Sequence, residues 1–166
     1  RVMEFPKIYI LSLEGAQRYE PLAAVLEARK LAFEVIWGID GRTRLPEEHE
    51  HRVDRPGAEA RMGRPMADGE FACALSHRKI YERIAAADAP SAIVLEDDAD
   101  PALPFFELGP ALVDPPCGLL LFDHKNTYVQ VRDRLILPGG VRAYRVALPP
   151  FLATGYMVSR EVAAHL

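Results

Sequence analysis

The segment Lys7-Ile8-Tyr9-Ile10-Leu11-Ser12-Leu13 is a short and nearly continuous run of apolar side chains. Such a run is typical of a β-strand that is covered on both faces, as in a parallel sheet. A helical pattern follows over residues 21–30, and a second apolar run covers residues 33–37. A strand, a crossover helix and a second strand within about 30 residues form a βαβ unit, so these residues predict an α/β fold.

The remaining chain keeps alternating between strand and helix patterns. A helix is expected to begin after Asp68, whose side chain suits the N-cap position. Residues 127–131 and 134–137 are interpreted as a ribbon or as paired edge segments, followed by a turn at Gly139-Gly140. Ser159 is expected to cap a final helix. Further apolar runs predict strands at residues 92–95, 118–123 and 154–158.

A length of 166 residues suits a single domain with one core. We expect residues 1–166 to form this domain, with a mixed sheet flanked by helices. Residues 42–68 differ from the rest, because they are rich in charged residues and almost free of large apolar side chains. They are interpreted as a charged surface loop or insertion that supplies no core face. Residues 163–166 resemble a helix cut partway, so we expect the natural chain to continue.

The overall charge argues against several classes of partner. The chain has 20 basic and 24 acidic residues and a net charge of −4, whereas proteins that bind duplex DNA are more often basic. No run of about 18 apolar residues predicts a membrane-spanning helix, and no signal peptide is visible. We therefore expect no nucleic-acid partner and no transmembrane segment.

The two cysteines, Cys73 and Cys117, lie far apart in the sequence. Neither belongs to a Cys-x-x-Cys pair, which argues against a disulfide framework and against a thiolate zinc site. We interpret both as small core residues of a protein in a reducing compartment, because free cysteine is among the most buried residue types.

The strongest chemical signal is Glu96-Asp97-Asp98, which follows directly on an apolar strand. Open α/β sheets bind their ligands beyond the carboxyl ends of the strands. Carboxylates crowded there suit a hard cation such as Mg²⁺ or Mn²⁺, which also accepts phosphate oxygens and water as ligands. Strand alternation would place Glu96 and Asp98 on one side and Asp97 on the other. The alternative interpretation is a solvated acidic turn.

Three other polar residues are candidates for chemistry. Ser76 and His77 are adjacent on a predicted helix, so their side chains point about 100° apart and cannot form a nucleophile–base pair. A purely structural role is the alternative for His77. Asp40 follows the second strand, where an acid can accept hydrogen bonds from a ribose, although Asp-Gly is also a common turn. The absence of G-x-G-x-x-G and G-x-x-x-x-G-K argues against a Rossmann NAD enzyme and a P-loop NTPase.

These segments, in this order, resemble glycosyltransferase family 25, which contains bacterial lipooligosaccharide galactosyltransferases and procollagen galactosyltransferases. The specific part is a Gly-Glu-x-x-Cys-x-x-Ser-His segment at residues 69–77, followed by Leu-Glu-Asp-Asp at residues 95–98. The resemblance also covers residues 8–13 with Arg18, residues 37–41 and residues 154–159.

The resemblance implies a GT-A type fold, a nucleotide-sugar donor that is commonly UDP-galactose, a divalent metal (Mn²⁺ or Mg²⁺) and inversion at the anomeric carbon. It implies a glycan acceptor such as lipopolysaccharide, and a cytoplasmic enzyme attached peripherally to the inner face of the membrane. Glu96 and Asp98 are the expected metal ligands. Asp123, which follows the fourth predicted strand, is a candidate catalytic base for the acceptor hydroxyl, and a base beyond residue 166 is the alternative. The residues expected to contact the donor are Ser12, Arg18, Asp40, Glu70, Ser76, His77 and Asp97.

Two other functions remain open at this point. Where the family usually continues as Asn-Leu-Asp-Arg-Arg, this chain has Ser12-Leu13-Glu14-Gly15-Ala16, without the Asn and two basic residues. This difference favours a catalytically inactive homologue that acts as a binding module, whereas the intact acidic run favours an enzyme. A Mg²⁺ phosphohydrolase built on Asp98-Ala99-Asp100 is less compatible, because Pro101-Ala102 follow where such enzymes usually carry Thr or Val.

Overall fold

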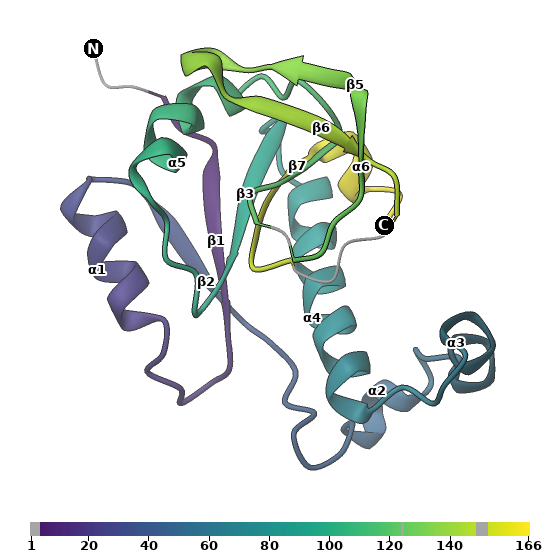
Figure 1. Cartoon of the computed structure of the whole chain (residues 1–166). Coiled ribbons are helices and arrows are strands. Elements are labelled where there is room, and N and C mark those ends of the chain that lie inside the picture. The colour runs from purple at the N-terminus through teal and green to yellow at the C-terminus, as the bar shows by residue number, and fades with distance from the viewer. Residues whose placement is uncertain (1–3, 124, 149–152) are drawn as a thin grey trace.

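The computed structural model describes residues 4–123, 125–148 and 153–166, and it contains a five-stranded sheet with helices on both faces (Figure 1). The strands of this sheet are β1 (Lys7–Ser12), β2 (Phe33–Trp37), β3 (Ser91–Glu96), β4 (Leu119–Leu121) and β7 (Gly155–Ser159). The helices that cover it are α1 (Glu20–Ala28), α4 (Asp68–Ala85), α5 (Leu103–Leu108) with the 3₁₀ turn η1 (Gly109–Leu112), and α6 (Arg160–Ala163). Within the described ranges, no helix combines the length and the hydropathy that crossing a membrane requires.

The sheet is mixed, with the strand order β2-β1-β3-β7-β4. Strand β1 pairs in parallel with both β2 and β3, whereas β7 runs antiparallel to β3 and to β4. Helix α1 connects β1 to β2 and completes the predicted βαβ unit. The predicted α/β fold with a mixed sheet flanked by helices is therefore confirmed, and it is consistent with a GT-A-like arrangement.

The core consists of two apolar layers, one on each face of the sheet. Successive strand residues point to opposite faces, which explains why the strands are continuous apolar runs in the sequence. One face packs against α1 and α5 through a cluster that includes Ile8, Ile10, Leu26, Ile93 and Phe106. The other face packs against α4 and α6 through a cluster that includes Tyr9, Ile80, Ile84, Val94 and Ala163.

A separate two-stranded ribbon lies between β4 and β7 in the chain. It pairs β5 (Val129–Ile136) with β6 (Arg142–Val146) through the turn η2 (Pro138–Gly140). Gly139 and Gly140 have φ angles of 75°, so the predicted glycine turn is confirmed. Of the two interpretations of residues 127–131 and 134–137, the ribbon is confirmed, and most of these residues lie in β5 rather than in two separate edge segments. They form one strand, because a register shift absorbs the irregular residues without ending the pairing.

Residues 42–68 contain two short helices, α2 (Glu47–Glu50) and α3 (Arg55–Met62), at the N-terminal end of α4 (Figure 1). Leu45 and Ala58 of this segment are buried against the first half of α4. The prediction that the segment supplies no core face is therefore wrong. Its few apolar side chains are far apart in the sequence, but folding brings them onto one patch of α4.

The start of α4 differs by one residue from the prediction. Ala67 takes the N-cap position, and Asp68 is the first residue of the helix. The Asp68 carboxylate instead accepts a hydrogen bond from the Leu45 amide at 3.0 Å and pairs with Arg55 at 2.9 Å. It therefore ties the charged segment to α4. Ser159 caps α6 as predicted, because its hydroxyl accepts a hydrogen bond from a backbone amide of that helix.

Candidate functional site

The acidic run lies where β1 and β3 end side by side. These strands are parallel, and Leu11 is paired with Glu96. Strand β3 ends at Glu96 and the chain turns at once, with the Ala99 amide donating to the Glu96 carbonyl at 3.0 Å. Because of this turn, the three acidic side chains fall into two groups with different partners.

The first group, called the Asp97–Asp98 group, consists of Ser12, Arg18, Asp97 and Asp98. The Ser12 hydroxyl donates to Asp97 Oδ2 at 2.9 Å. Arg18 Nη2 donates to Asp98 Oδ2 at 2.9 Å and lies 3.7 Å from Asp97 Oδ1. The side chain of Asp97 is 14% exposed and that of Asp98 is 55% exposed, so the group extends from the interior to the solvent. Its three charged side chains line a surface groove of about 270 Å³ together with residues of α1.

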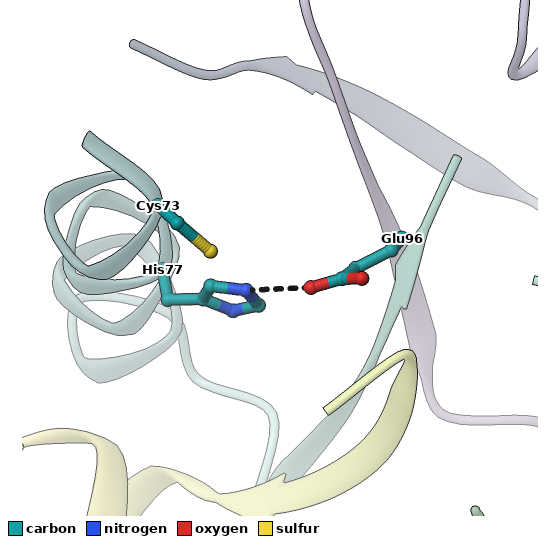
Figure 2. Close-up of side chains that lie close together, drawn as sticks. All are labelled: Cys73, His77 and Glu96. Carbon is teal, nitrogen blue, oxygen red and sulfur yellow. Dashed lines mark hydrogen bonds and ion pairs between the residues drawn. The ribbon is translucent and has the colours of Figure 1, made fainter. Parts of the chain in front are cut away.

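The second group, called the Cys73–His77–Glu96 group, lies between α4 and the end of β3. Cys73 and His77 are one turn apart on α4, and Glu96 extends toward them from β3 (Figure 2). His77 Nε2 lies 3.2 Å from Glu96 Oε1. One ligand atom from each of the three residues lies within 4.8 Å of the other two. This group therefore brings sulfur, nitrogen and oxygen ligands to one point.

A tyrosine holds the opposite edge of the His77 ring. His77 Nδ1 lies 2.7 Å from the Tyr156 hydroxyl. Burial opposes protonation of the ring, but its interactions with Cys73 and Glu96 outweigh burial and raise the pKa of His77 to about 9. Burial also raises the pKa of Tyr156, so that hydroxyl stays neutral. At neutral pH the ring therefore carries two protons, one toward Glu96 and one toward Tyr156.

The predicted grouping of the acids is wrong. Strand alternation would pair Glu96 with Asp98, but one guanidinium nitrogen of Arg18 contacts both Asp97 and Asp98, while Glu96 contacts His77. The physical reason is the turn after Glu96, which ends the alternation of side chains along the strand. Glu96 and Asp98 thus lie in different groups, and metal binding by either residue stays a prediction.

Ser76 is hydrogen-bonded to the loop that follows β2. Its hydroxyl accepts a hydrogen bond from the Ile39 amide at 2.8 Å and donates to the Ala72 carbonyl at 2.6 Å. Asp40, the next residue of the loop, is exposed and forms an ion pair with Arg42, which lowers the pKa of Asp40 to about 2. Contact of Ser76 or Asp40 with a donor stays a prediction.

Glu70 lies in the first turn of α4 and belongs to neither acidic group. Its carboxylate accepts hydrogen bonds from the Arg64 guanidinium at 2.8 and 2.6 Å and from the Ala67 amide at 2.8 Å. These bonds lower the pKa of Glu70 to about 2. The contacts of Glu70 with Arg64 and the Ala67 amide stabilise the start of α4. A role of Glu70 in donor binding stays a prediction.

Asp123 follows β4 and lines a larger groove of about 1400 Å³ between the sheet and the β5–β6 ribbon. Asp123 Oδ1 and Thr127 Oγ1 are buried without a hydrogen-bond partner among the described residues. Residues 99–101 border both grooves. The predicted base is therefore in a hollow that reaches the acidic turn.

Sequence reasoning missed Cys73 and Tyr156 as parts of this site. The prediction that both cysteines are core residues is wrong for Cys73, which is exposed, whereas Cys117 is half-buried and packs against the core. The spacing of Cys73 and His77 was the available signal, since residues at i and i+4 share one face of a helix. No local pattern indicates Tyr156, which reaches the site only because β7 pairs with β3.

The sequence was compared with models of known protein families. The model described as "Glycosyltransferase family 25 (LPS biosynthesis protein)" matches residues 5–112, a range that contains both acidic groups. The chain belongs to glycosyltransferase family 25. The family expected from the sequence is therefore confirmed, and Asp123 and Tyr156 lie beyond the matched range of family 25.

Two relatives each match the chain over 100 residues. Procollagen galactosyltransferase 1 of Danio rerio is 29% identical, over 58% of this chain and 17% of that protein. Probable inactive glycosyltransferase 25 family member 3 of Rattus norvegicus is 32% identical, over 58% of this chain and 18% of that protein. The chain therefore matches less than a fifth of either relative, and their names describe both a transferase and an inactive member.

Proposed function

We propose that this family 25 chain binds a nucleotide-sugar and acts as an inverting, metal-dependent hexosyltransferase. The observation that carries the proposal is the Asp97–Asp98 group. It places an arginine and two carboxylates at the carboxyl end of β3, the edge of an open α/β sheet where ligands bind. Arg18 supplies the guanidinium that suits a phosphate group, because its planar fork can donate two parallel hydrogen bonds.

The Asp97–Asp98 group also fits the divalent cation that family membership implies. Mg²⁺ and Mn²⁺ prefer carboxylate oxygens and retain several water or phosphate ligands. Asp98 is exposed enough to accept such an ion, and the Arg18 contacts place Asp97 beside it. These two residues would hold the ion. When bound, it supplies Lewis-acid neutralisation of the charge that develops on the departing diphosphate.

The remaining donor contacts are proposed from the residues around this group. Ser12 fixes the Asp97 carboxylate through its hydrogen bond and is itself buried. Ser76 holds the Ile39 amide, which positions Asp40 to accept hydrogen bonds from a ribose. Glu70 and His77 are proposed to border the donor from α4.

We propose that the acceptor binds in the larger groove and that Asp123 is its general base. In an inverting transfer, the acceptor oxygen forms a bond to the anomeric carbon while the bond to the diphosphate breaks. The electron pair leaves with the diphosphate, and the hydroxyl proton passes to a carboxylate on the opposite face of the sugar. Asp123 suits this role because its buried Oδ1 has no described hydrogen-bond partner.

The sugar, the acceptor and the location are proposals drawn from family names. Galactose is the first sugar to test, with UDP-galactose as its donor, because one relative is named a galactosyltransferase. The family description names LPS biosynthesis, so a bacterial cell-surface glycan is the proposed acceptor. We propose that the protein works in the cytoplasm, in peripheral contact with the inner face of the membrane.

A binding module without transferase activity is the second candidate function. The segment from Ser12 to Ala16 lacks the Asn and two of the basic residues usual in the family, and one relative is named probable inactive. Release of UDP or galactose from UDP-galactose by this chain would exclude this candidate. Nucleotide binding without any release would support it.

Thermal unfolding tests the donor site. Mn²⁺ together with UDP is expected to raise the melting temperature, because a ligand that binds only the folded state stabilises it. Asp98→Ala is expected to abolish the shift. Glu82→Gln is the matched control, since Glu82 is also an exposed carboxylate paired with an arginine, and it is expected to retain the shift. Absence of a shift in the unmodified protein with any nucleoside diphosphate would contradict the proposal.

A further inference from the structure

We propose that Cys73, His77 and Glu96 bind one transition-metal ion of the Zn²⁺ class, at a site distinct from the hard-cation site of the Asp97–Asp98 group. The proposal rests on the ligands that α4 and β3 bring together and does not depend on the transferase activity.

The geometry suits a compact metal site. Figure 2 shows the Cys73 sulfur, the His77 ring and the Glu96 carboxylate directed toward one another. Their ligand atoms lie within 4.8 Å of one another, and bonds of about 2.0–2.3 Å to a tetrahedral zinc ion place ligand atoms about 3.5 Å apart. Small side-chain rotations therefore close the site. Two ligands at i and i+4 on one helix face also have the spacing of zinc-binding His residues in H-E-x-x-H helices.

The ligand types select the class of metal. A thiolate and an imidazole favour borderline or soft ions such as Zn²⁺, whereas Mg²⁺ and Mn²⁺ prefer sites made only of oxygen. The Asp97–Asp98 group offers only oxygen ligands, so the two sites differ in the metal they prefer. Three protein ligands leave a fourth position for water, as in zinc sites that stay open.

The surroundings orient the ligands. The contact between His77 Nδ1 and the Tyr156 hydroxyl directs Nε2 toward Cys73 and Glu96. A partner on the second ring nitrogen is a regular feature of metal-binding histidines, because it fixes the tautomer and the ring orientation. His77 is also the ion-pair partner of Glu96 among the described residues, so no described arginine or lysine occupies that carboxylate.

The exposure of the ligands provides an entry path for the ion. Cys73 is exposed and the Glu96 side chain is 31% exposed, while His77 closes the inner side of the site. Binding forms metal bonds to sulfur, nitrogen and oxygen, and it releases the thiol proton and the Nε2 proton to water. The bound ion would join α4 to the last residue of β3 and hold Glu96 in place directly before the Asp97–Asp98 turn.

Titration of the reduced, chelator-treated full chain with Co²⁺ tests the site, because a cobalt–thiolate bond gives a charge-transfer absorption band. We expect this band, together with the visible bands of a tetrahedral ion, to saturate at one equivalent and to disappear when Zn²⁺ is added. Cys73→Ser is expected to remove the charge-transfer band without unfolding the protein, since Cys73 is exposed. Glu96→Gln is expected to weaken Co²⁺ binding at least tenfold.

Two controls separate this proposal from the donor site. Cys117→Ser removes the other cysteine and is expected to leave the cobalt spectrum unchanged. Asp98→Asn is expected to leave the cobalt spectrum unchanged as well, even though Asp98 serves the proposed donor site. Absence of the charge-transfer band, its persistence in Cys73→Ser, or its loss in Asp98→Asn would overturn the proposal.

Discussion

Glu96 and Asp98 are two residues apart, yet their carboxylates lie in different chemical environments. Asp98 is 55% exposed and paired with Arg18, whereas Glu96 is 31% exposed and paired with the buried His77. The Asp97–Asp98 group offers oxygen ligands and a guanidinium, which suit a diphosphate with a hard cation. The Cys73–His77–Glu96 group offers sulfur, nitrogen and oxygen ligands. In this fold, adjacent acids therefore belong to two groups with different partners, separated by one turn of the backbone.

The largest expected effect on stability comes from His77→Ala, which removes the buried side chain of the Cys73–His77–Glu96 group. Removal of the ring leaves the Tyr156 hydroxyl and the Glu96 carboxylate without this partner and opens space beside α4. We expect a loss of about 3 kcal/mol in the free energy of unfolding. Urea unfolding measures it. His165→Ala is the control, because that histidine is exposed, and a change below about 0.5 kcal/mol is expected. Equal losses of stability in His77→Ala and His165→Ala would contradict the structural role assigned to His77.

A smaller effect is expected inside the Asp97–Asp98 group. Ser12→Ala removes a buried hydroxyl that donates to a carboxylate, and we expect it to cost about 1.5 kcal/mol in the same assay. Asp98→Asn removes an exposed ion pair and is expected to cost less than about 0.5 kcal/mol. Such a small cost would mean that Asp98 contributes little to stability, which is expected of a residue that serves ligand binding. A cost for Asp98→Asn as large as that for Ser12→Ala would contradict this division.

The smallest expected effect concerns the pKa of Glu70, an acid that belongs neither to the Asp97–Asp98 group nor to the Cys73–His77–Glu96 group. Its pKa of about 2 lies below the ordinary value of 4.5 because of Arg64 and the Ala67 amide. Since the folded-state pKa is lowered, its contribution to stability is present above pH 4.5 and is lost as the pH falls toward 2. Carboxyl NMR titration measures the pKa. Arg64→Gln should raise it toward 4.5, and an unchanged value in that variant would show that Arg64 is not the cause.

The sequence predicts the fold well and the site only in part. Apolar runs such as residues 7–12 specify buried strands, and Glu96-Asp97-Asp98 lies at the end of a buried strand, as expected. The sequence does not predict that Glu96 has different partners from Asp97 and Asp98. This difference depends on the residue at which β3 ends and on which carboxylates Arg18 contacts. Tyr156 comes to His77 through an antiparallel pairing between segments far apart in the chain. Local patterns do not contain such pairings.

The most direct test of the central claim is isothermal titration calorimetry of UDP binding in the presence of Mn²⁺. We predict saturable binding to the unmodified chain and at least tenfold weaker binding to Asp98→Asn. Glu82→Gln, which changes an equally exposed carboxylate outside the groove, should bind UDP as the unmodified chain does. Equal affinity of Asp98→Asn and the unmodified chain would contradict the assignment of the Asp97–Asp98 group as the nucleotide-sugar site.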